Sequence, residues 1–284
     1  MNAFALTKLR RSDLDTLVSW AEQEGWNPGP HDADVFWRTD PHGYWGFFRG
    51  LELIAGGSIV SYGGEFGFMG FFIVQKAYRH QGIGRKLWLL RLDAMRQRLR
   101  AKAPIGMDGV VAMQPFYARG GFKPAFHSIR METRGRRFSL HPRIEIMEDG
   151  ETGNILKLDR ECFGYSREAF IRAWMTMPES RTFCFRDKAG LGGFAVMRRA
   201  ARGYKIGPLF AQDTGVAQVL LQACQDAAGE ESLFLDVPQI NREAVDLAAR
   251  SGMKPVFECV RMYNGDPPDI PVGKIFGITS FELG

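Results

Sequence analysis

The chain contains two copies of one sequence segment, and this repeat limits the folds available to it. GFKPAFHSIRM at 121–131 recurs as GMKPVFECVRM at 252–262, with Gly, Lys, Pro, Phe, Arg and Met at the same places and an offset of 131 residues. Upstream of each copy, an apolar strand-like segment precedes an amphipathic helix, expected at 84–100 and at 216–227. Two repeats are too few for a solenoid, so the sequence predicts duplication of a whole domain, for which 284 residues suffice.

The junction between the two copies is a basic, polar segment that contains proline, TRGRRFSLHPR at 133–143. We therefore expect one domain at 1–135 and a second at 143–284. Each half places helices before strands rich in glycine and aromatic residues, and then continues as strand, loop, helix, strand, helix, strand. This order predicts an α/β fold, with a mixed sheet of the α+β kind that carries helices on its faces.

Composition and residue spacing argue against several classes of protein. No apolar run reaches the roughly 18 to 20 residues that cross a bilayer, and no secretory signal is apparent, so we expect a cytoplasmic protein without a membrane partner. The histidines form no HxH or HExxH pair and the cysteines no CxxC pair, so no metal is expected. The net charge of +5 is spread along the chain, which disfavours nucleic-acid binding. The oligomeric state stays open.

One loop carries chemical information. In QKAYRHQGIGRKL at 75–87, Gly82 and Gly84 lie where the first long helix begins. A helix start presents free backbone N–H groups and the positive end of the helix dipole, which together bind anions, and glycines let a phosphate group approach closely. Arg79 and Arg85 add charged donors. Neither GxxxxGK[ST] nor GxGxxG is present, so the loop is not a P-loop or a dinucleotide fingerprint.

The wider context of this loop resembles the GNAT superfamily of N-acetyltransferases. RHQGIG at 79–84 matches the family's [RQ]xxGx[GA] loop, and FYARGGF at 116–122 matches its Tyr-x-x-x-Gly-Phe segment. The resemblance covers about residues 4–131 well and the second half weakly. It implies a tandem duplication of the GNAT acyl-CoA N-acyltransferase fold that uses acetyl-CoA as cosubstrate.

The family fold further implies that the strand ending at Val74 splays from its neighbour and that pantetheine pairs with the exposed strand edge. The pyrophosphate is then expected on the amides from about Gln81 to Lys86. The residues expected to bind the cofactor are Ile73, Val74, Arg79, His80, Gln81, Gly82, Ile83, Gly84, Arg85 and Lys86.

Two residues are candidates for proton transfer. Tyr117 stands where the family often has a general acid that protonates the leaving thiolate of coenzyme A, and a phenol suits that task. Its alternative role is packing against the sulfur end of the cofactor. Asp108, at the end of the next strand, is the first candidate for the general base, with a solvated loop carboxylate as the alternative. The Asn often found seven residues before the Tyr is Val110 here.

The segment AEQEGWNPGPHDADVFW at 21–37 lies between the first helices, which roof the acceptor pocket in this fold. Glu24 is a second candidate for the base, and Trp26, Asp32 and Trp37 could shape a site for a cation. The alternative is that Trp26 only begins a rigid turn.

The second half lacks the groups that the first half uses. On the repeat alignment, Ala248 replaces the tyrosine and AQDTGV replaces RHQGIG, with Asp213 where a phosphate would sit, although Asn241 keeps the family's asparagine. We therefore expect a degenerate GNAT-like domain that serves as scaffold. The closing segment at 274–284 is strand-like and is expected at this domain's edge or at the interface.

These features predict an N-acetyltransferase that moves acetyl from acetyl-CoA to a primary amine of a small molecule by direct attack in a ternary complex. The alternative is a binding module, an acyl-CoA sensor or regulator that keeps the loop but performs no transfer.

Overall fold

The computed structural model describes residues 5–147 and 152–284. Each half follows the predicted order of elements. The first half contains β1 (Thr7–Lys8), α1 (Arg11–Gln23), α2 (Asp32–Thr39), β2 (Tyr44–Arg49), β3 (Glu52–Tyr62), β4 (Phe66–Val74), α3 (Ile83–Arg98), β5 (Ile105–Val110), α4 (Gln114–Arg119) and β6 (Lys123–Arg134). The second contains β7 (Ile144–Ile146), α5 (Gly153–Phe163), α6 (Glu168–Met175), β8 (Ser180–Asp187), β9 (Gly190–Arg199), β10 (Tyr204–Ala211), α7 (Thr214–Ala227), β11 (Ser232–Pro238), α8 (Arg242–Arg250), β12 (Lys254–Asn264) and β13 (Ile275–Gly277).

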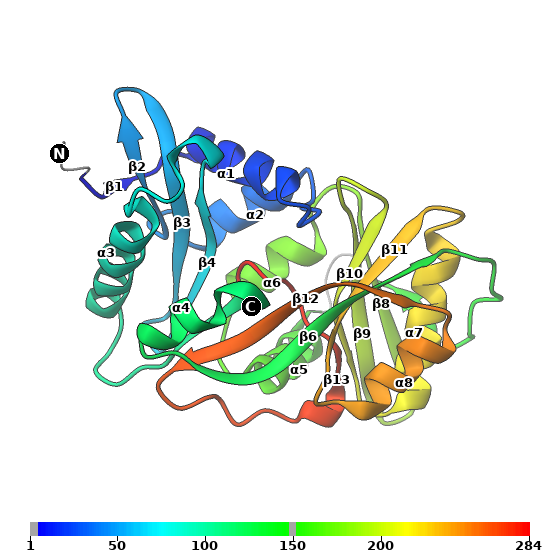
Figure 1. Cartoon of the computed structure of the whole chain (residues 1–284). Helices are drawn as coiled ribbons and strands as arrows, with labels where there is room; N and C mark the ends of the chain where they lie inside the picture. Colours follow the sequence, from blue (N-terminus) through cyan, green and yellow to red (C-terminus); the bar gives the residue numbers. More distant parts are fainter. Residues whose placement is uncertain (1–4, 148–151) are drawn as a thin grey trace.

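The two halves exchange their last long strands. In the described residues, the strands form one mixed sheet in the order β1-β2-β3-β4-β5-β12-β6-β11-β10-β9-β8-β7, with β13 paired to β10. Strand β12 of the second half therefore lies beside β5 of the first, and β6 lies beside β11, while β6 and β12 pair with each other (Figure 1). The repeated segments at 121–131 and 252–262 are thus antiparallel neighbours at the centre of the molecule, and neither half completes its sheet alone.

Two buried ion pairs fix the exchanged strands, and they are related by the repeat. Arg261 on β12 donates two hydrogen bonds, each 2.7 Å long, to the carboxylate of Asp108 on β5. Its repeat equivalent on β6, Arg130, donates two bonds of 2.7 and 2.8 Å to Asp236 on β11. Each guanidinium also lies over aromatic rings, Arg261 over Phe68 and Phe126, and Arg130 over Phe257 and Phe281.

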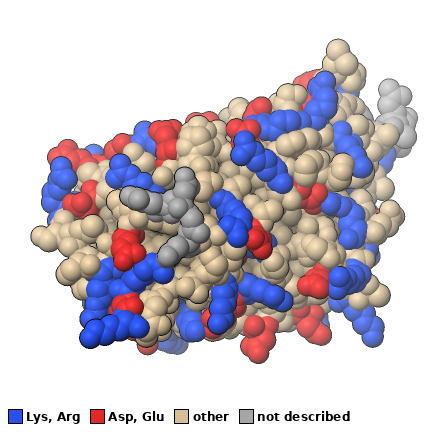
Figure 2. All heavy atoms as spheres, turned by 180° about the vertical axis from the view of Figure 1, so that it is seen from behind, with Lys and Arg blue, Asp and Glu red and all other residues tan. Residues whose placement is uncertain are grey.

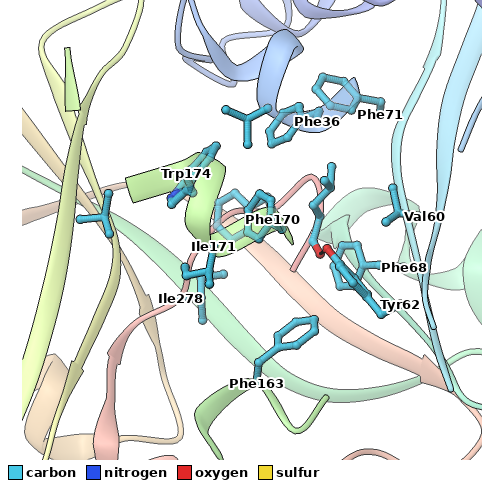
Figure 3. Close-up of a cluster of buried hydrophobic side chains, with 14 of the residues drawn as sticks. Phe36, Val60, Tyr62, Phe68, Phe71, Phe163, Phe170, Ile171, Trp174 and Ile278 are labelled. Carbon is cyan, nitrogen blue, oxygen red and sulfur yellow. Dashed lines mark hydrogen bonds between the residues drawn. The ribbon is translucent and has the colours of Figure 1, made fainter. Parts of the chain in front are cut away.

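Helices cover both faces of the sheet. Helices α3 and α4 pack on one face of the first half through an apolar stripe that includes Trp88, Leu92 and Met95, and α7 packs on the second half in the same way. On the other face, α1 and α2 meet α5 and α6 of the second half. Figure 3 shows part of this shared core, where Phe36 of α2 stacks on Trp174 of α6 with ring centroids 5.7 Å apart. The interface between the halves is therefore a continuous hydrophobic core.

The buried pairs allow a test of the strand exchange. Asp236→Asn should lower the free energy of unfolding by about 3 to 5 kcal/mol, because it removes the charged partner that accepts both side-chain bonds of the buried Arg130. Urea denaturation of the intact chain measures this loss. Glu231→Gln, which breaks the exposed pair with Arg199, is the matched control and should cost at most about 1 kcal/mol. Equal losses in the two variants would mean that the buried pair does not hold the strands.

Candidate active site

Strands β4 and β5 separate soon after they meet, which opens a cleft in the sheet. They pair in parallel only at Gly67 with Ile105 and Phe68 with Gly106. Beyond these pairs β4 continues to Val74, paired to β3 but not to β5. The splay that the family resemblance implies is therefore present, and it exposes one edge of β4 from about Met69 onward.

An irregularity in β4 lies beside this cleft. The register between β3 and β4 shifts between Gly56 and Ser58, and Phe71 adopts a positive φ of 48°, a conformation that is strained for a bulky side chain. The Phe71 ring packs against Phe36 of α2, with centroids 5.6 Å apart. The bulge thus redirects the β4 backbone at the widest part of the cleft and is held by packing on the α1 and α2 side.

A cavity of about 530 Å³ occupies the cleft. Both halves contribute to its wall, which is mostly apolar. Its lining residues are Glu24, Trp26, Met69, Gly70, Phe71, Phe72, Ile73, Val74, Arg79, His80, Gly82, Gly84, Arg85, Trp88, Met107, Asp108, Val110, Met113, Phe116, Tyr117, Phe257, Cys259, Phe281 and Glu282.

At one end of the cavity the glycine loop meets the start of α3. Gly82 is the N-cap residue with φ +77°, and α3 begins at Ile83. In the described part of the chain, no backbone acceptor bonds the amides of residues 80–85. Ile73, Val74, His80, Gly82, Gly84 and Arg85 border the cavity or its mouth, whereas Gln81 and Lys86 are exposed and Ile83 is buried in the α3 packing.

Arg79 is already engaged within the protein. Its Nε donates to the carbonyl oxygen of Val74 at 2.9 Å, and its Nη2 donates to Oε1 of Glu24 at 2.6 Å. Arg79 therefore ties the loop to the end of β4 and to the end of α1. Arg85 is exposed beside the free amides, so it is the arginine of this loop that remains available to an anion.

Tyr117 lies in the cavity wall, against Trp88 and Phe72. Its ring centroid is 4.9 Å from that of Trp88, and only 4% of the residue is exposed. Burial raises the pKa of the phenol well above its ordinary value, which the nearby Arg91 opposes, so the hydroxyl keeps its proton.

Asp108 reaches the cavity wall, but its carboxylate is buried and both oxygens accept bonds from Arg261. Burial raises the pKa of Asp108, and the charge of Arg261 opposes this rise. The solvated loop carboxylate that sequence allowed as an alternative is therefore not what the fold produces. The carboxylate is held by β12 of the second half.

The predicted acceptor residues separate into two groups. Glu24 and Trp26 line the cavity. Asp32 lies away from it, fully buried, where it accepts from the Gly29 amide at 2.8 Å and pairs with Arg198 of the second half at 2.9 Å. Trp37 stacks on Tyr44 with centroids 5.9 Å apart. Asp32 and Trp37 therefore support the interface and the helix packing in this structure.

Comparison with known proteins settles the family. A model described as the acetyltransferase (GNAT) family matches residues 11–122, and a model described as an acetyltransferase (GNAT) domain matches residues 155–277. The chain belongs to the GNAT superfamily. It carries two GNAT domains in tandem, as the repeat predicted.

Several relatives share both halves. Holothin acyltransferase of Pseudoalteromonas sp. (strain SANK 73390) is 26% identical over 93% of this chain and 89% of its own length. A putative acetyltransferase from Pyrococcus horikoshii aligns over 100% of this chain and 97% of its own, with a TM-score of 0.85 and 22% identity. A tandem GNAT protein from the clavulanic acid biosynthesis pathway aligns over 94% of this chain and 100% of its own, with a TM-score of 0.65 and 12% identity. These matches support a GNAT acyltransferase of the tandem type, a family whose members use acyl-CoA.

The second GNAT domain has the same cleft, but a strand of the protein fills it. Strands β10 and β11 pair only at three positions that begin with Tyr204 and Leu233. Where they separate, β13 pairs with β10, and Ile278 donates its amide to the Asp236 carbonyl on β11 at 2.9 Å. The closing segment was expected at an edge or at the interface. Instead β13 lies inside the sheet, and only the residues after it reach the interface.

Two residues that align with ligand positions of the family bond other parts of the second half. Asp213 accepts the Val216 amide at 2.8 Å and so caps α7, where the first domain leaves its amides free. Asn241 donates to the carbonyl oxygens of Val272 and Ile275 at 3.1 and 3.0 Å, which anchors the segment that enters the cleft. The second cleft is therefore closed at both the anion end and the strand edge.

Several residues at the site were not predicted from the sequence. Phe281 and Glu282 reach the cavity from the end of the second half, and Cys259 reaches it from the exchanged β12. Arg91 of α3 is fully buried below the cleft and donates to the carbonyl oxygens of Ser58 and Gly70. Of these residues, only Arg91 could have been noticed in the sequence, because it lies one helical turn from Trp88 and from Met95 on the apolar stripe of α3 and is therefore expected to be buried.

Charge and hydropathy over the rest of the molecule are ordinary. On the face that Figure 2 shows, lysine and arginine side chains are interspersed with aspartate and glutamate. Across residues 5–147 and 152–284, no helix is long and apolar enough to span a membrane, and no group of three or more His, Cys, Asp or Glu side chains could hold a metal ion.

The loop geometry separates the roles of its two glycines. Gly82 has a positive φ, so Gly82→Ala should lower the free energy of unfolding by about 1 kcal/mol. A Cβ at Gly84 would make only ordinary contacts with Val74 and Phe72, so Gly84→Ala should leave stability unchanged or raise it by about 0.5 kcal/mol. Thermal melts of both variants test this. A loss at Gly84 equal to that at Gly82 would show that the fold itself requires both glycines.

Proposed function

We propose that this chain is an N-acetyltransferase that transfers acetyl from acetyl-CoA to a primary amine of a small molecule. The amine attacks the thioester directly while both substrates are bound. The observation that carries the proposal is a single cavity in which three features meet: the loop with free amides, the open edge of β4, and the hydroxyl of Tyr117.

The loop supports the phosphate end of the proposal. Six consecutive backbone amides at residues 80–85, at the positive end of α3, find no backbone acceptor within residues 5–147 and 152–284. The fold does not need Gly84, since a Cβ there would fit, and glycine near a helix start costs stability. We assign Gly84 the role of letting a pyrophosphate approach these amides, with Arg85 as a charged neighbour.

Tyr117 supports the chemical step. When the amine nitrogen attacks, the C–N bond forms, the C–S bond breaks, and the sulfur leaves as a thiolate that needs a proton. Tyr117 holds its proton because burial raises its pKa, and the residue lines the cavity. We assign it the role of general acid. A pure sensor of acyl-CoA would not need a proton donor at this position.

The two halves then have different tasks. Residues 1–135 bind the cosubstrate and supply Tyr117, whereas residues 143–284 form a degenerate GNAT-like domain whose own cleft is filled. Strand β12 of the second half also pairs with β5 of the first half, where Arg261 binds Asp108. Because that bond occupies both oxygens of Asp108, we assign this carboxylate to holding the exchanged strand in place.

The filled second cleft predicts one cosubstrate site per chain. Calorimetric titration with acetyl-CoA should saturate at one equivalent. Gly84→Ala should weaken binding by at least about 10-fold without loss of melting temperature, because the added Cβ obstructs a phosphate but not the protein. Gly215→Ala in α7 is the matched control and should bind normally. Saturation at two equivalents would contradict the closed second cleft.

Removing the Tyr117 hydroxyl tests its role. Tyr117→Phe should lower kcat by a factor of about 10² and leave the affinity for acetyl-CoA unchanged, because only proton delivery is lost. The raised pKa means that the phenol stays protonated at higher pH than a free tyrosine, so wild-type kcat should not fall through its ionisation up to about pH 10. A steady-state pH series measures both. Wild-type turnover in the Phe variant would reduce Tyr117 to a packing residue.

A further inference from the structure

The last described segment, 278–284, is fixed inside the molecule. All its residues are buried. Tyr62 of the first half donates to the carbonyl oxygen of Leu283 at 2.8 Å, and Arg167 of the second half donates to that of Gly284 at 2.6 Å. Both halves therefore hold this segment, and its path from the second cleft brings Phe281 and Glu282 to the wall of the first cavity.

Glu282 is an unusual member of that wall. The residue is 2% exposed, and its Oε2 atom is buried with no hydrogen-bond partner in the described residues. Its backbone oxygen packs against Gly70, beside the bulge at Phe71, where any Cβ would collide with it. Glu282 thus lies against β4 at Gly70, beside Phe71, and lines the same cavity as both.

The other acidic residues of the cavity are already neutralised. Glu24 pairs with Arg79 at 2.6 Å, and Asp108 is bound through both oxygens by Arg261. The nearby Arg130 is bound in the same way by Asp236. Glu282 is therefore the one carboxylate, among the described residues that line the cavity, that no arginine bonds. The positive charges of Arg130 and of the buried Lys205 lie close enough to interact with it.

A buried carboxylate oxygen without a partner costs free energy, since it has lost its hydration without gaining a bond. Such a group needs an explanation, and a bound ligand is one. The ligand that suits this oxygen is a cation that donates hydrogen bonds. The surrounding wall is aromatic: Trp26, Phe71, Phe257 and Phe281 all line the same cavity.

Resting on the proposed function, we infer that Glu282 binds the ammonium group of the acceptor and removes its first proton, and that the acceptor is a monoamine with an aromatic body. One free carboxylate can neutralise one ammonium group, so a polyamine would leave further charges unpaired in an apolar cavity. Aromatic side chains can pack on the body of the acceptor. The second half therefore supplies the acceptor specificity of the first.

The proton balance follows from these roles. The ammonium gives one proton to Glu282 and becomes a neutral amine, whose lone pair attacks the thioester carbonyl. Tyr117 gives its proton to the departing thiolate. The nitrogen loses its second proton after the C–N bond has formed, and that proton restores Tyr117. The products are the amide, the free thiol of coenzyme A and one proton released from Glu282 to solvent.

Binding measurements test the ammonium site separately from catalysis. We expect 2-phenylethylamine to bind the wild-type chain and to bind Glu282→Gln at least about 10-fold more weakly, because the counter-charge is gone. The neutral product, N-acetyl-2-phenylethylamine, should bind both equally. Glu258→Gln, which changes an exposed residue on the neighbouring strand β12, is the control and should bind like wild type. Absence of amine binding to the wild type, or equal amine binding to Glu282→Gln, would overturn the assignment.

A merely structural role for Glu282 makes the opposite prediction for stability. Since its oxygen is unpaired, Glu282→Gln should melt at the wild-type temperature or above it. Glu282→Asp keeps the charge but shortens the side chain, and should restore part of the amine affinity. A lower melting temperature for the Gln variant, with amine affinity unchanged, would assign Glu282 to packing.

Thiol release from acetyl-CoA then tests the catalytic role. The kcat/KM for 2-phenylethylamine should exceed that for spermidine by at least about 10-fold and should fall by about 10² or more in Glu282→Gln, with one equivalent of acetyl-CoA still bound. Preference for spermidine would overturn the monoamine assignment. Loss of transfer in Asp108→Asn but not in Glu282→Gln would return the base role to Asp108. If the chain bound the amine but released no thiol, the proposed acetyl transfer would be wrong, whereas the assignment of Glu282 as the ammonium-binding residue would still hold.

Discussion

The antiparallel pairing of β6 with β12 is the constraint on which the rest of the structure depends. It places the last strand of each half in the sheet of the other, and the Arg130–Asp236 and Arg261–Asp108 pairs secure both ends of the exchange. Without β12, strand β5 would be an unpaired edge on the far side of the cleft between β4 and β5. The first half therefore needs the second for the wall of its own active site, whether or not the second binds a ligand.

The two halves have equivalent clefts, and in the second half the protein's own strand β13 fills the cleft. In the first half the cleft stays open because β4 and β5 separate after two paired positions. In the second, β13 occupies the gap, Asp213 bonds the helix start, and Asn241 bonds the entering segment. Each replacement satisfies polar backbone groups that a ligand would otherwise satisfy, which is why the second half keeps its shape after losing the ligand groups.

The sequence predicted the features that depend on local pattern. The tandem GNAT fold and the mixed sheet are confirmed. Both could be predicted because hydrophobic periodicity and the GNAT loop can be recognised within short stretches of sequence. It could not predict the strand exchange, because β6 and β12 carry nearly the same residues and would fit either sheet. It could not predict that Asp108 would be bound, because its partner lies 153 residues away. Glu282 belongs to no motif, and its place in the cavity follows only from the path of the segment after β13.

The separation of β5 from β12 along the chain also has a consequence for synthesis. A ribosome completes every element of the first half, including Tyr117 and the glycine loop, long before Arg261 emerges to meet Asp108. Until then the nascent first half exposes the unpaired edge of β5 and the carboxylate of Asp108 without its partner. Both can form non-native contacts. Pairing over so long a stretch of chain is also slow. The sheet that borders the open cleft can therefore be completed only after β12 has been synthesised.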